Sequence, residues 1–148
     1  EAILKSMLSV GHRIPKKNIL ISSGPTRSKV ELLNSTRMLI EKGYNIYSTA
    51  GTAKFFKENG IDTQILYWPD EDKEPNIMEY LHDRRIDLVI NIPKNHTKRE
   101  LDNGYKIRRA AVDYNIPLIT NARLASAFIY AICKVDPSEI AIKSWDEY

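Results

Sequence analysis

The sequence has 148 residues and one cysteine, Cys133, so no disulfide can form within the chain. The three histidines, His12, His82 and His96, are too far apart to have metal-ligand spacing. Apolar runs such as "IDLVINI" are much shorter than the roughly 20 residues that cross a membrane, and no signal peptide is visible. These absences predict a soluble intracellular domain with no metal site, no membrane partner, surface histidines and a buried Cys133.

A strong excess of one charge is also lacking. The sequence has 22 Lys and Arg against 19 Asp and Glu, and the resulting net charge of +3 is spread along the chain. This charge is too mild to indicate a nucleic-acid partner. Neither GxGxxG nor GxxxxGK[ST] occurs, so a dinucleotide or P-loop nucleotide site is not expected, and we expect no cofactor in this domain.

Strand-like and helix-like patterns alternate along the chain, whose length suits one domain. The pattern predicts strands at 18–22, 45–49, 63–68, 86–92 and 116–120, and helices at 28–43, 52–60, 76–85, around 107–114 and at 122–133. The most apolar strand, 86–92, is expected to be central, and the polar segment 93–103 to be a loop. The expected fold is therefore α/β, a five-stranded, mainly parallel sheet with helices on both faces.

Polar side chains follow most of the predicted strands. "SSGPTRSK" with Ser23 and Lys29 follows the first strand, and "STAGT" with Thr49 and Thr52 follows the second. In a parallel sheet, ligands bind beyond the carboxyl ends of the strands. The hydroxyl-rich turn before the helix at 52–60 suits an anion, because the first N–H groups of a helix lack partners within it. The same turn is also typical of ordinary helix capping.

Trp68 and Asn91 each allow two interpretations. A tryptophan just beyond a strand either covers the core or forms the apolar wall of a pocket. A buried amide such as that of Asn91 must be hydrogen-bonded, and it either fixes the next loop or faces a ligand.

The charged residues near these strand ends are also ambiguous. Asp70 and Asp72 lie in an acidic loop, where solvated charge is favoured over a role as general acid or base. Lys94, Lys98 and Arg99 suit a solvated face, and Lys94 alone is a candidate for ligand contact.

Four stretches carry a family resemblance: "IYSTAGTAKFFKENGI", "VINIP", "IRRAAVDYNIPLIT" and the lead-in "EAILKSMLSVGHRIPKKNILIS". Together they resemble the carboxyl-terminal regulatory domain of the large subunit of carbamoyl-phosphate synthetase, a member of the methylglyoxal synthase-like group. The likeness covers essentially the whole chain. It implies that residues 1–15 end the preceding synthetase segment and that 16–148 form the regulatory domain.

The resemblance implies that the domain itself performs no chemistry and binds a small anionic effector. The parent chain would be an ATP-dependent ligase that uses Mg or Mn and makes carbamoyl phosphate for the arginine and pyrimidine pathways. Its partners would be the rest of the large subunit and a glutaminase subunit. A cytoplasmic location is expected, with a mitochondrial one as the alternative.

The resemblance also assigns effector-binding residues. Members that respond to UMP or IMP hold phosphate at the turn matched by Thr49 and Thr52, with a basic residue matched by Lys29. Members that respond to N-acetylglutamate add a tryptophan before proline, matched by Trp68, and asparagines. The full expected set is Ser23, Lys29, Thr49, Thr52, Trp68, Asn91, Lys94 and Asn103. The identity of the effector stays open between N-acetylglutamate-like anions and UMP or IMP.

Three alternatives differ from this interpretation. A methylglyoxal synthase-type phosphate lyase would carry a catalytic Asp in a GGDQ-like segment, where this chain has "YWPDEDKEP". An IMP cyclohydrolase domain shares a similar "STGGTAK" turn, but its catalytic segment with lysine and histidine is missing here. A domain that has lost its ligand and serves only subunit contacts would bind no physiological anion.

Overall fold

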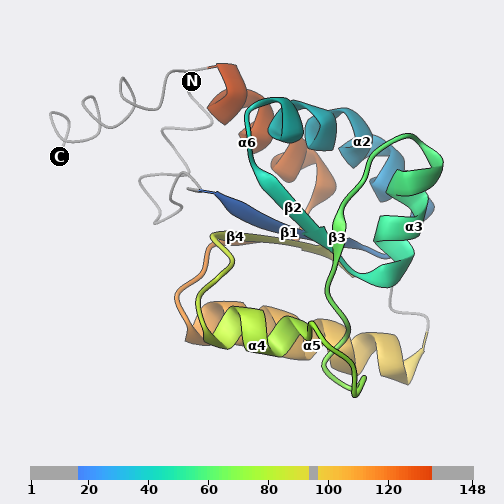
Figure 1. Ribbon diagram of the computed structural model, residues 1–148, viewed down its shortest axis with the longest axis vertical. Coiled ribbons are helices and arrows are strands. Elements are labelled where there is room, and N and C mark those ends of the chain that lie inside the picture. Colours follow the sequence, from blue (N-terminus) through green and yellow to red (C-terminus); the bar gives the residue numbers. More distant parts are fainter. Residues whose placement is uncertain (1–16, 94–96, 135–148) are drawn as a thin grey trace, which may run out of the picture.

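The computed structural model describes residues 17–93 and 97–134 (Figure 1). The elements in chain order are β1 (Asn18–Ser23), α2 (Thr26–Glu41), β2 (Asn45–Ser48), α3 (Ala50–Glu58), β3 (Gln64–Ile65), α4 (Ile77–His82), β4 (Leu88–Ile92), α5 (Lys98–Asp113), β5 (Leu118–Ile119) and α6 (Ala122–Lys134). The strands form one parallel sheet in the order β3-β2-β1-β4-β5, which confirms the predicted fold class. The segment 1–15, assigned above to a preceding synthetase region, lies outside the described residues.

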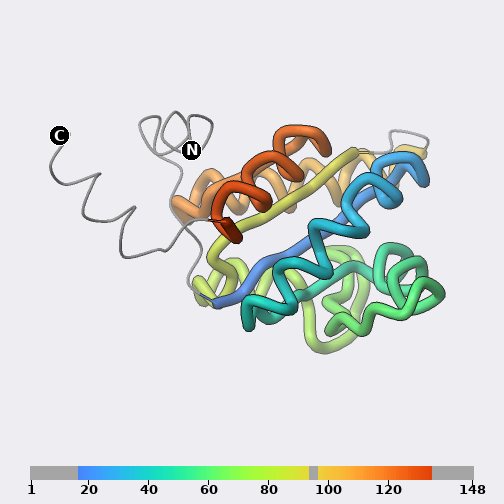
Figure 2. Tube along the Cα trace, turned by 90° about the horizontal axis from the view of Figure 1, so that it is seen from above, coloured from blue at the N-terminus to red at the C-terminus, as the bar shows by residue number. Residues whose placement is uncertain are grey.

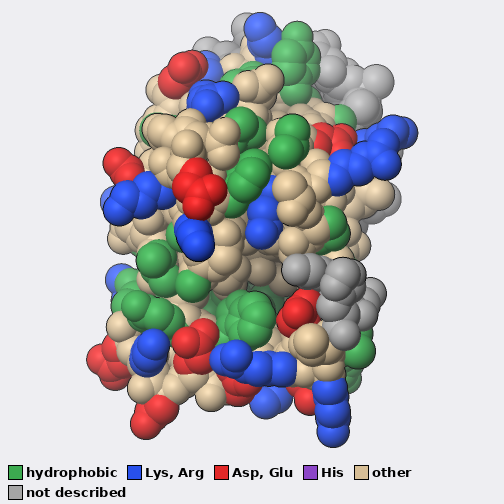
Figure 3. Space-filling model, turned by 90° about the vertical axis from the view of Figure 1, so that its right-hand side faces the viewer, with side chains coloured by type: hydrophobic (Ala, Val, Ile, Leu, Met, Phe, Trp, Pro, Cys, Tyr) green, Lys and Arg blue, Asp and Glu red, His purple; other side chains and the backbone are tan. Residues whose placement is uncertain are grey.

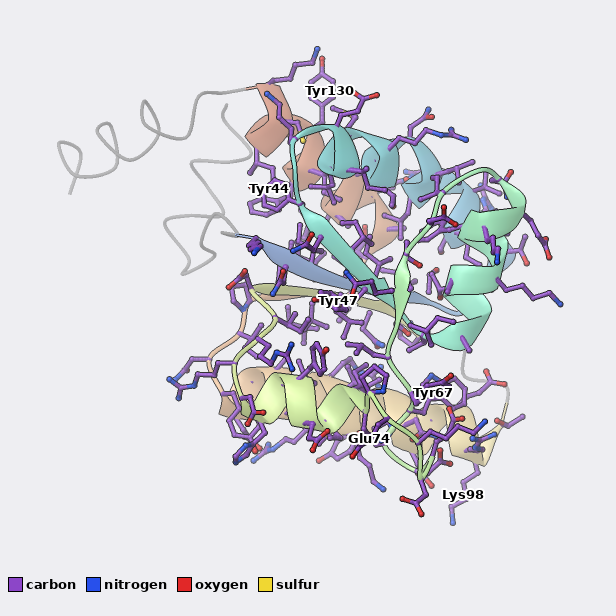
Figure 4. All side chains as sticks on the ribbon, viewed as in Figure 1. Tyr44, Tyr47, Tyr67, Glu74, Lys98 and Tyr130 are labelled. Atoms are coloured by element: carbon purple, nitrogen blue, oxygen red, sulfur yellow. The ribbon has the colours of Figure 1, made fainter. Side chains whose placement is uncertain are left out.

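The sheet separates two helical layers. Helices α2, α3 and α6 cover one face and α4 and α5 the other (Figure 1), and α2 and α6 run side by side over their face (Figure 2). Successive residues of β1 point to opposite faces, so Ile19 and Ile21 join the core under α2, α3 and α6. Leu20 joins the second core with Tyr47, which lies between the sheet and α4 (Figure 4). Because both faces are covered, β1 and β4 each contain a run of buried apolar residues, at 19–21 and 88–90.

The strand order reverses next to β1. The chain runs from β1 outward through β2 to β3, then returns to the other side of β1 to form β4 and β5. The crevice beyond the carboxyl ends of β1 and β4 is therefore the switch point at which open α/β sheets bind ligands. Strand β4 is internal and fully buried, as expected, although the middle position belongs to β1.

Two errors in the predicted boundaries affect the residues near the strand ends. The third strand ends at Ile65, and Trp68 lies in a loop whose one strand-like contact is the bridge between Tyr67 and Asn76. The polar segment predicted as a loop over 93–103 is helical from Lys98 onward. Thr97 caps α5 by accepting a hydrogen bond from the Glu100 N–H at 3.1 Å, and Thr-x-x-Glu is a sequence signature of this cap. Asn103 therefore lies on a helix.

The sequence also predicted a buried cysteine and surface histidines. Cys133 is buried within α6, and its burial raises the pKa of the thiol. The His82 side chain is 70% exposed, whereas His12 and His96 lie outside the described residues. Within residues 17–93 and 97–134, no group of three or more His, Cys, Asp or Glu could hold a metal ion. No helix in those ranges is long and apolar enough to cross a membrane.

Glycine is required where α3 ends. Gly60 follows the last turn with φ of +82°, a left-handed conformation that strains any residue with a Cβ. Gly51, in the first turn of the same helix, has no positive φ, and a Cβ there would meet no atom within 4 Å.

These two glycines make a matched test. Gly60→Ala should lower the free energy of unfolding by about 1–2 kcal/mol, because the left-handed conformation penalises a Cβ. Gly51→Ala should cause no loss, because alanine favours a helix over glycine by about 1 kcal/mol. Urea unfolding followed by circular dichroism measures both, and equal losses in the two variants would contradict the argument.

Candidate effector site

A cavity of about 210 Å³ opens at the carboxyl ends of the strands. Figure 3 looks onto this edge of the sheet, and its centre is hollowed between the two helical layers. The described lining residues are Ser22, Ser23, Gly24, Lys29, Thr49, Gly51, Thr52, Trp68, Asn91, Ile92, Pro93, Glu100, Asn103, Gly104 and Ile107. Seven of the eight residues expected from the sequence are among them, and the eighth, Lys94, lies outside the described residues.

Buried hydroxyls join β1 to the first turn of α3. The Thr52 hydroxyl oxygen accepts a hydrogen bond from the Ser23 N–H at 3.0 Å, and the hydroxyl donates to the Ser23 carbonyl at 3.2 Å. The Thr49 hydroxyl donates to Ser22 Oγ at 3.1 Å and lies 3.4 Å from Thr52 Oγ1. Both threonines are buried, so these bonds fix the start of α3 against the end of β1.

The N-terminus of α3 opens into the cavity. Thr49 occupies the N-cap position, but its side chain accepts no hydrogen bond from the helix, because it points to Ser22 instead. The first turn contains no acidic residue. The unpaired N–H groups of that turn and the positive end of the helix dipole therefore face the space beside Gly51. Ordinary capping by Thr49, the alternative considered from the sequence, is not what the structure shows.

Two further groups favour an anion at this end. Ser23 Oγ is buried, with only 4% of the residue exposed, and has no hydrogen-bond partner. A buried hydroxyl without a partner is costly, so a ligand oxygen at this point would satisfy it. Lys29, in the first turn of α2, lines the same cavity and supplies a positive charge.

The α5 side of the cavity contains an amide held by an arginine. Arg108 Nη1 donates to Asn91 Oδ1 at 2.8 Å, and Asn91 lines the cavity. This bond ties β4 to α5, so the buried amide is hydrogen-bonded, as a buried amide must be. A Cβ at Gly104 would lie 2.9 Å from Arg108 Nη1, so a side chain there would push the guanidinium away from Asn91.

Trp68 forms part of the wall rather than only covering the core. It is half-buried and lines the cavity. The backbone N–H of Trp68 donates to Glu71 Oε1 at 3.2 Å, and Asn76 Nδ2 donates to the backbone carbonyl of Trp68 at 3.0 Å. The Arg99 guanidinium lies over its ring, 5.0 Å from the centroid.

The Arg99 side chain is 57% exposed, which fits the predicted solvated face, but its charge is also paired. It forms a two-bond ion pair with Asp70, with Nε to Oδ2 at 2.7 Å and Nη2 to Oδ1 at 3.1 Å. The hydrogen bonds that Arg99 donates to the Asp70 carboxylate, and after them the contact with the Asn103 side chain, hold the pKa of Asp70 below its usual value. Lys98 does point away from the sheet into solvent (Figure 4).

Sequence reasoning missed Ser22, Glu100 and Arg108. Ser22 belongs to a strand end that was already singled out, so its strand-end position was an available signal. Glu100 was missed because the start of α5 was misplaced. Arg108 lay within the predicted helix, but its hydrogen bond to Asn91 joins residues 17 positions apart, and no local pattern indicates it. Among the described lining residues, Glu100 is the one carboxylate and none is a histidine.

The chain is similar to known proteins in sequence and in fold. Residues 31–120 match the family model of the MGS-like domain, and the chain belongs to this family. A solved methylglyoxal synthase from Elizabethkingia anophelis superimposes with a TM-score of 0.55 at 16% identity, covering 78% of this chain and 79% of that one, and so shows the same fold.

The curated relatives are much longer proteins. The chain is 44% identical over 141 residues to multifunctional protein ura1 of Schizosaccharomyces pombe, and 42% over 146 residues to multifunctional protein CAD of Squalus acanthias. It is 38% identical over 138 residues to human mitochondrial carbamoyl-phosphate synthase [ammonia]. These matches cover about nine-tenths of the chain, 90%, 89% and 90%, but only 6%, 6% and 9% of the relatives. They confirm the resemblance to carbamoyl-phosphate synthetase proteins.

The contribution of the hydrogen bonds between β1 and α3 can be tested by measuring the free energy of unfolding. Thr52→Val should lower the free energy of unfolding by about 1–3 kcal/mol, because the Ser23 N–H and carbonyl both lose their buried partner. Thr52→Ser keeps the hydroxyl and should lose markedly less. Urea titration compares the two, and equal destabilisation would show that the methyl group, rather than the hydroxyl, holds α3 against β1.

Proposed function

We propose that this chain is the effector-binding regulatory domain of a carbamoyl-phosphate synthetase large chain, and that its ligand is a small anion. The observation that carries the proposal is the unpartnered buried hydroxyl of Ser23 beside the uncapped N-terminus of α3, in a cavity that Lys29 also lines. Backbone N–H groups, a hydroxyl and a cation around one space are suited to a phosphate or carboxylate.

The setting of the domain follows from its relatives and is part of the proposal. The chain spans a small fraction of proteins named for multifunctional or carbamoyl-phosphate synthase activity. The parent enzyme would then be an ATP-dependent ligase that uses Mg or Mn, with the rest of the large subunit and a glutaminase subunit as partners. We propose a cytoplasmic location, with mitochondria as the alternative, since the name of the human relative includes "mitochondrial".

The two walls of the cavity would hold different parts of the effector. The charged end would bind at α3, between Ser23 and Lys29, while an uncharged part packs on Trp68 and Ile107. Glu100 lines the opposite side, where it disfavours a second negative charge and favours hydroxyl or N–H groups. This feature favours a nucleotide such as UMP or IMP over N-acetylglutamate, which carries two carboxylates.

Effector control requires two states of the parent enzyme. The effector must bind one of them more tightly, because a ligand with equal affinity for both shifts nothing. A ligand that contacts α3 and α5 at once would favour the arrangement in which both walls are correctly spaced.

We propose that the domain is not itself a catalyst. The aspartate that follows the predicted third strand, Asp70, is not among the lining residues and is paired with Arg99, so it is not placed to act as the base of a phosphate lyase. Incubation with dihydroxyacetone phosphate should give no methylglyoxal above background. Turnover that is abolished by Asp70→Asn would overturn this part of the proposal.

Ser23→Ala tests the binding site with little disturbance of the fold, because Ser23 Oγ has no partner to lose. A hydrogen bond to a charged group contributes about 1.5–3 kcal/mol, so affinity for the anion should fall tenfold or more. Calorimetric titration of the 148-residue chain with UMP, IMP and N-acetylglutamate measures this effect. We expect one of them to bind.

Ser48→Ala is the matched control. Ser48 is also a buried serine at the end of a strand with an unpartnered hydroxyl, but it does not line the cavity. Its substitution should leave affinity unchanged. If all three ligands fail to bind the wild-type chain, or if Ser23→Ala and Ser48→Ala behave alike, the anion site is not where we place it.

A further inference from the structure

Trp68 belongs to a loop with little regular structure of its own. Strand β3 ends at Ile65 and helix α4 begins at Ile77, so the aromatic wall of the cavity is not carried by either element. Contacts from Glu71 and Asn76 fold the loop on itself. They do not fix the position of Trp68 relative to α5, which forms the adjoining wall.

That position is fixed by a closed set of bonds between the loop and the first turns of α5. Asp70 and Arg99 form the ion pair described above, and Asn103 Oδ1 accepts from the Asp70 N–H at 3.2 Å. Asn103 lies one turn after Arg99 on α5, and its Nδ2 donates to the Arg99 carbonyl at 3.0 Å. Each of the three residues therefore bonds to both others.

Arg99 links this set of bonds to the cavity wall. Its guanidinium lies over the Trp68 ring while it holds the Asp70 carboxylate, so the ion pair orients the cation against the ring face. A guanidinium fork suits this double role, because it binds a carboxylate with two parallel bonds and stacks on an aromatic ring.

We infer that Asp70 and Arg99 are positioning residues that hold Trp68 as the wall of the effector cavity. They affect how strongly the uncharged part of an effector binds, and they do not affect the binding of its anionic end at α3. The inference rests on the proposed function for the identity of the ligand, but the position of Trp68 can be measured without any ligand.

The test is a double-mutant cycle with Asp70→Ala, Arg99→Ala and both together. UMP and N-acetylglutamate are titrated, and inorganic phosphate serves as a probe of the α3 end alone. An exposed ion pair contributes little to stability by itself. We therefore expect each single variant to lose about two- to fivefold in affinity for whichever of UMP and N-acetylglutamate binds the wild-type chain, called the larger ligand below. The double variant should lose no more than either single one, because both act through one contact. Phosphate affinity should not change.

Trp68 also provides a readout without ligand. In a Trp145→Phe background, Trp68 is the one tryptophan, and acrylamide quenching reports its exposure. Quenching should increase in Asp70→Ala and Arg99→Ala, and Arg99→Lys should give an intermediate value because it keeps the charge and loses the fork. Asp113→Ala removes a different ion pair of α5, which Asp113 forms with Arg109, and should change neither quenching nor affinity.

The outcomes separate the two claims. If the wild-type chain binds none of the ligands, the proposed function fails, while increased quenching would still support the positioning role. If quenching and affinity are unchanged in the Asp70 and Arg99 variants, the inference is wrong. Equal losses for phosphate and the larger ligand would also overturn it, because the pair would then support the whole cavity.

Discussion

The site depends on one joint, the hydrogen bonds between the Thr52 hydroxyl and both backbone groups of Ser23. They hold the first turn of α3 against the end of β1, and Thr49 is drawn to Ser22 instead of capping its own helix. Two groups are consequently left without partners at the same place, the N–H groups of that turn and the Ser23 hydroxyl. The fold thus contains a group of hydrogen-bond donors without partners, and such a group suits an anion.

The opposite wall comes from the other helical layer. Asn91 is oriented by Arg108, and Trp68 is held over α5 by Arg99. The cavity therefore lies between an element of each layer, at the point where the strand order reverses. An effector that contacts both walls would couple α3 to α5 across the edge of the sheet, which gives a regulatory domain a means of responding to its ligand.

Local patterns made the fold and the hydroxyl turn predictable. Apolar runs gave the strands, and the rule on strand ends located Ser23, Thr49 and Thr52 near one another without knowledge of any contact. The start of α5 was missed although the Thr97-x-x-Glu100 cap was present, so Asn103 was assigned to a loop. The pairing of Asp70 with Arg99 joins residues 29 positions apart and depends on tertiary packing, which no local pattern encodes. Nor can a sequence show that one buried hydroxyl has a partner and another has none.

The most direct measurement of the central claim is the backbone amide spectrum of the isotope-labelled chain during titration with UMP. If an anion binds at the uncapped helix, the amide signals of Gly51 and Thr52 should shift most, with that of Ser23 close behind, and they should saturate together. The Gly60 amide at the far end of α3 should stay in place. Shifts concentrated away from these three residues, or none at millimolar ligand for UMP, IMP and N-acetylglutamate alike, would contradict the account.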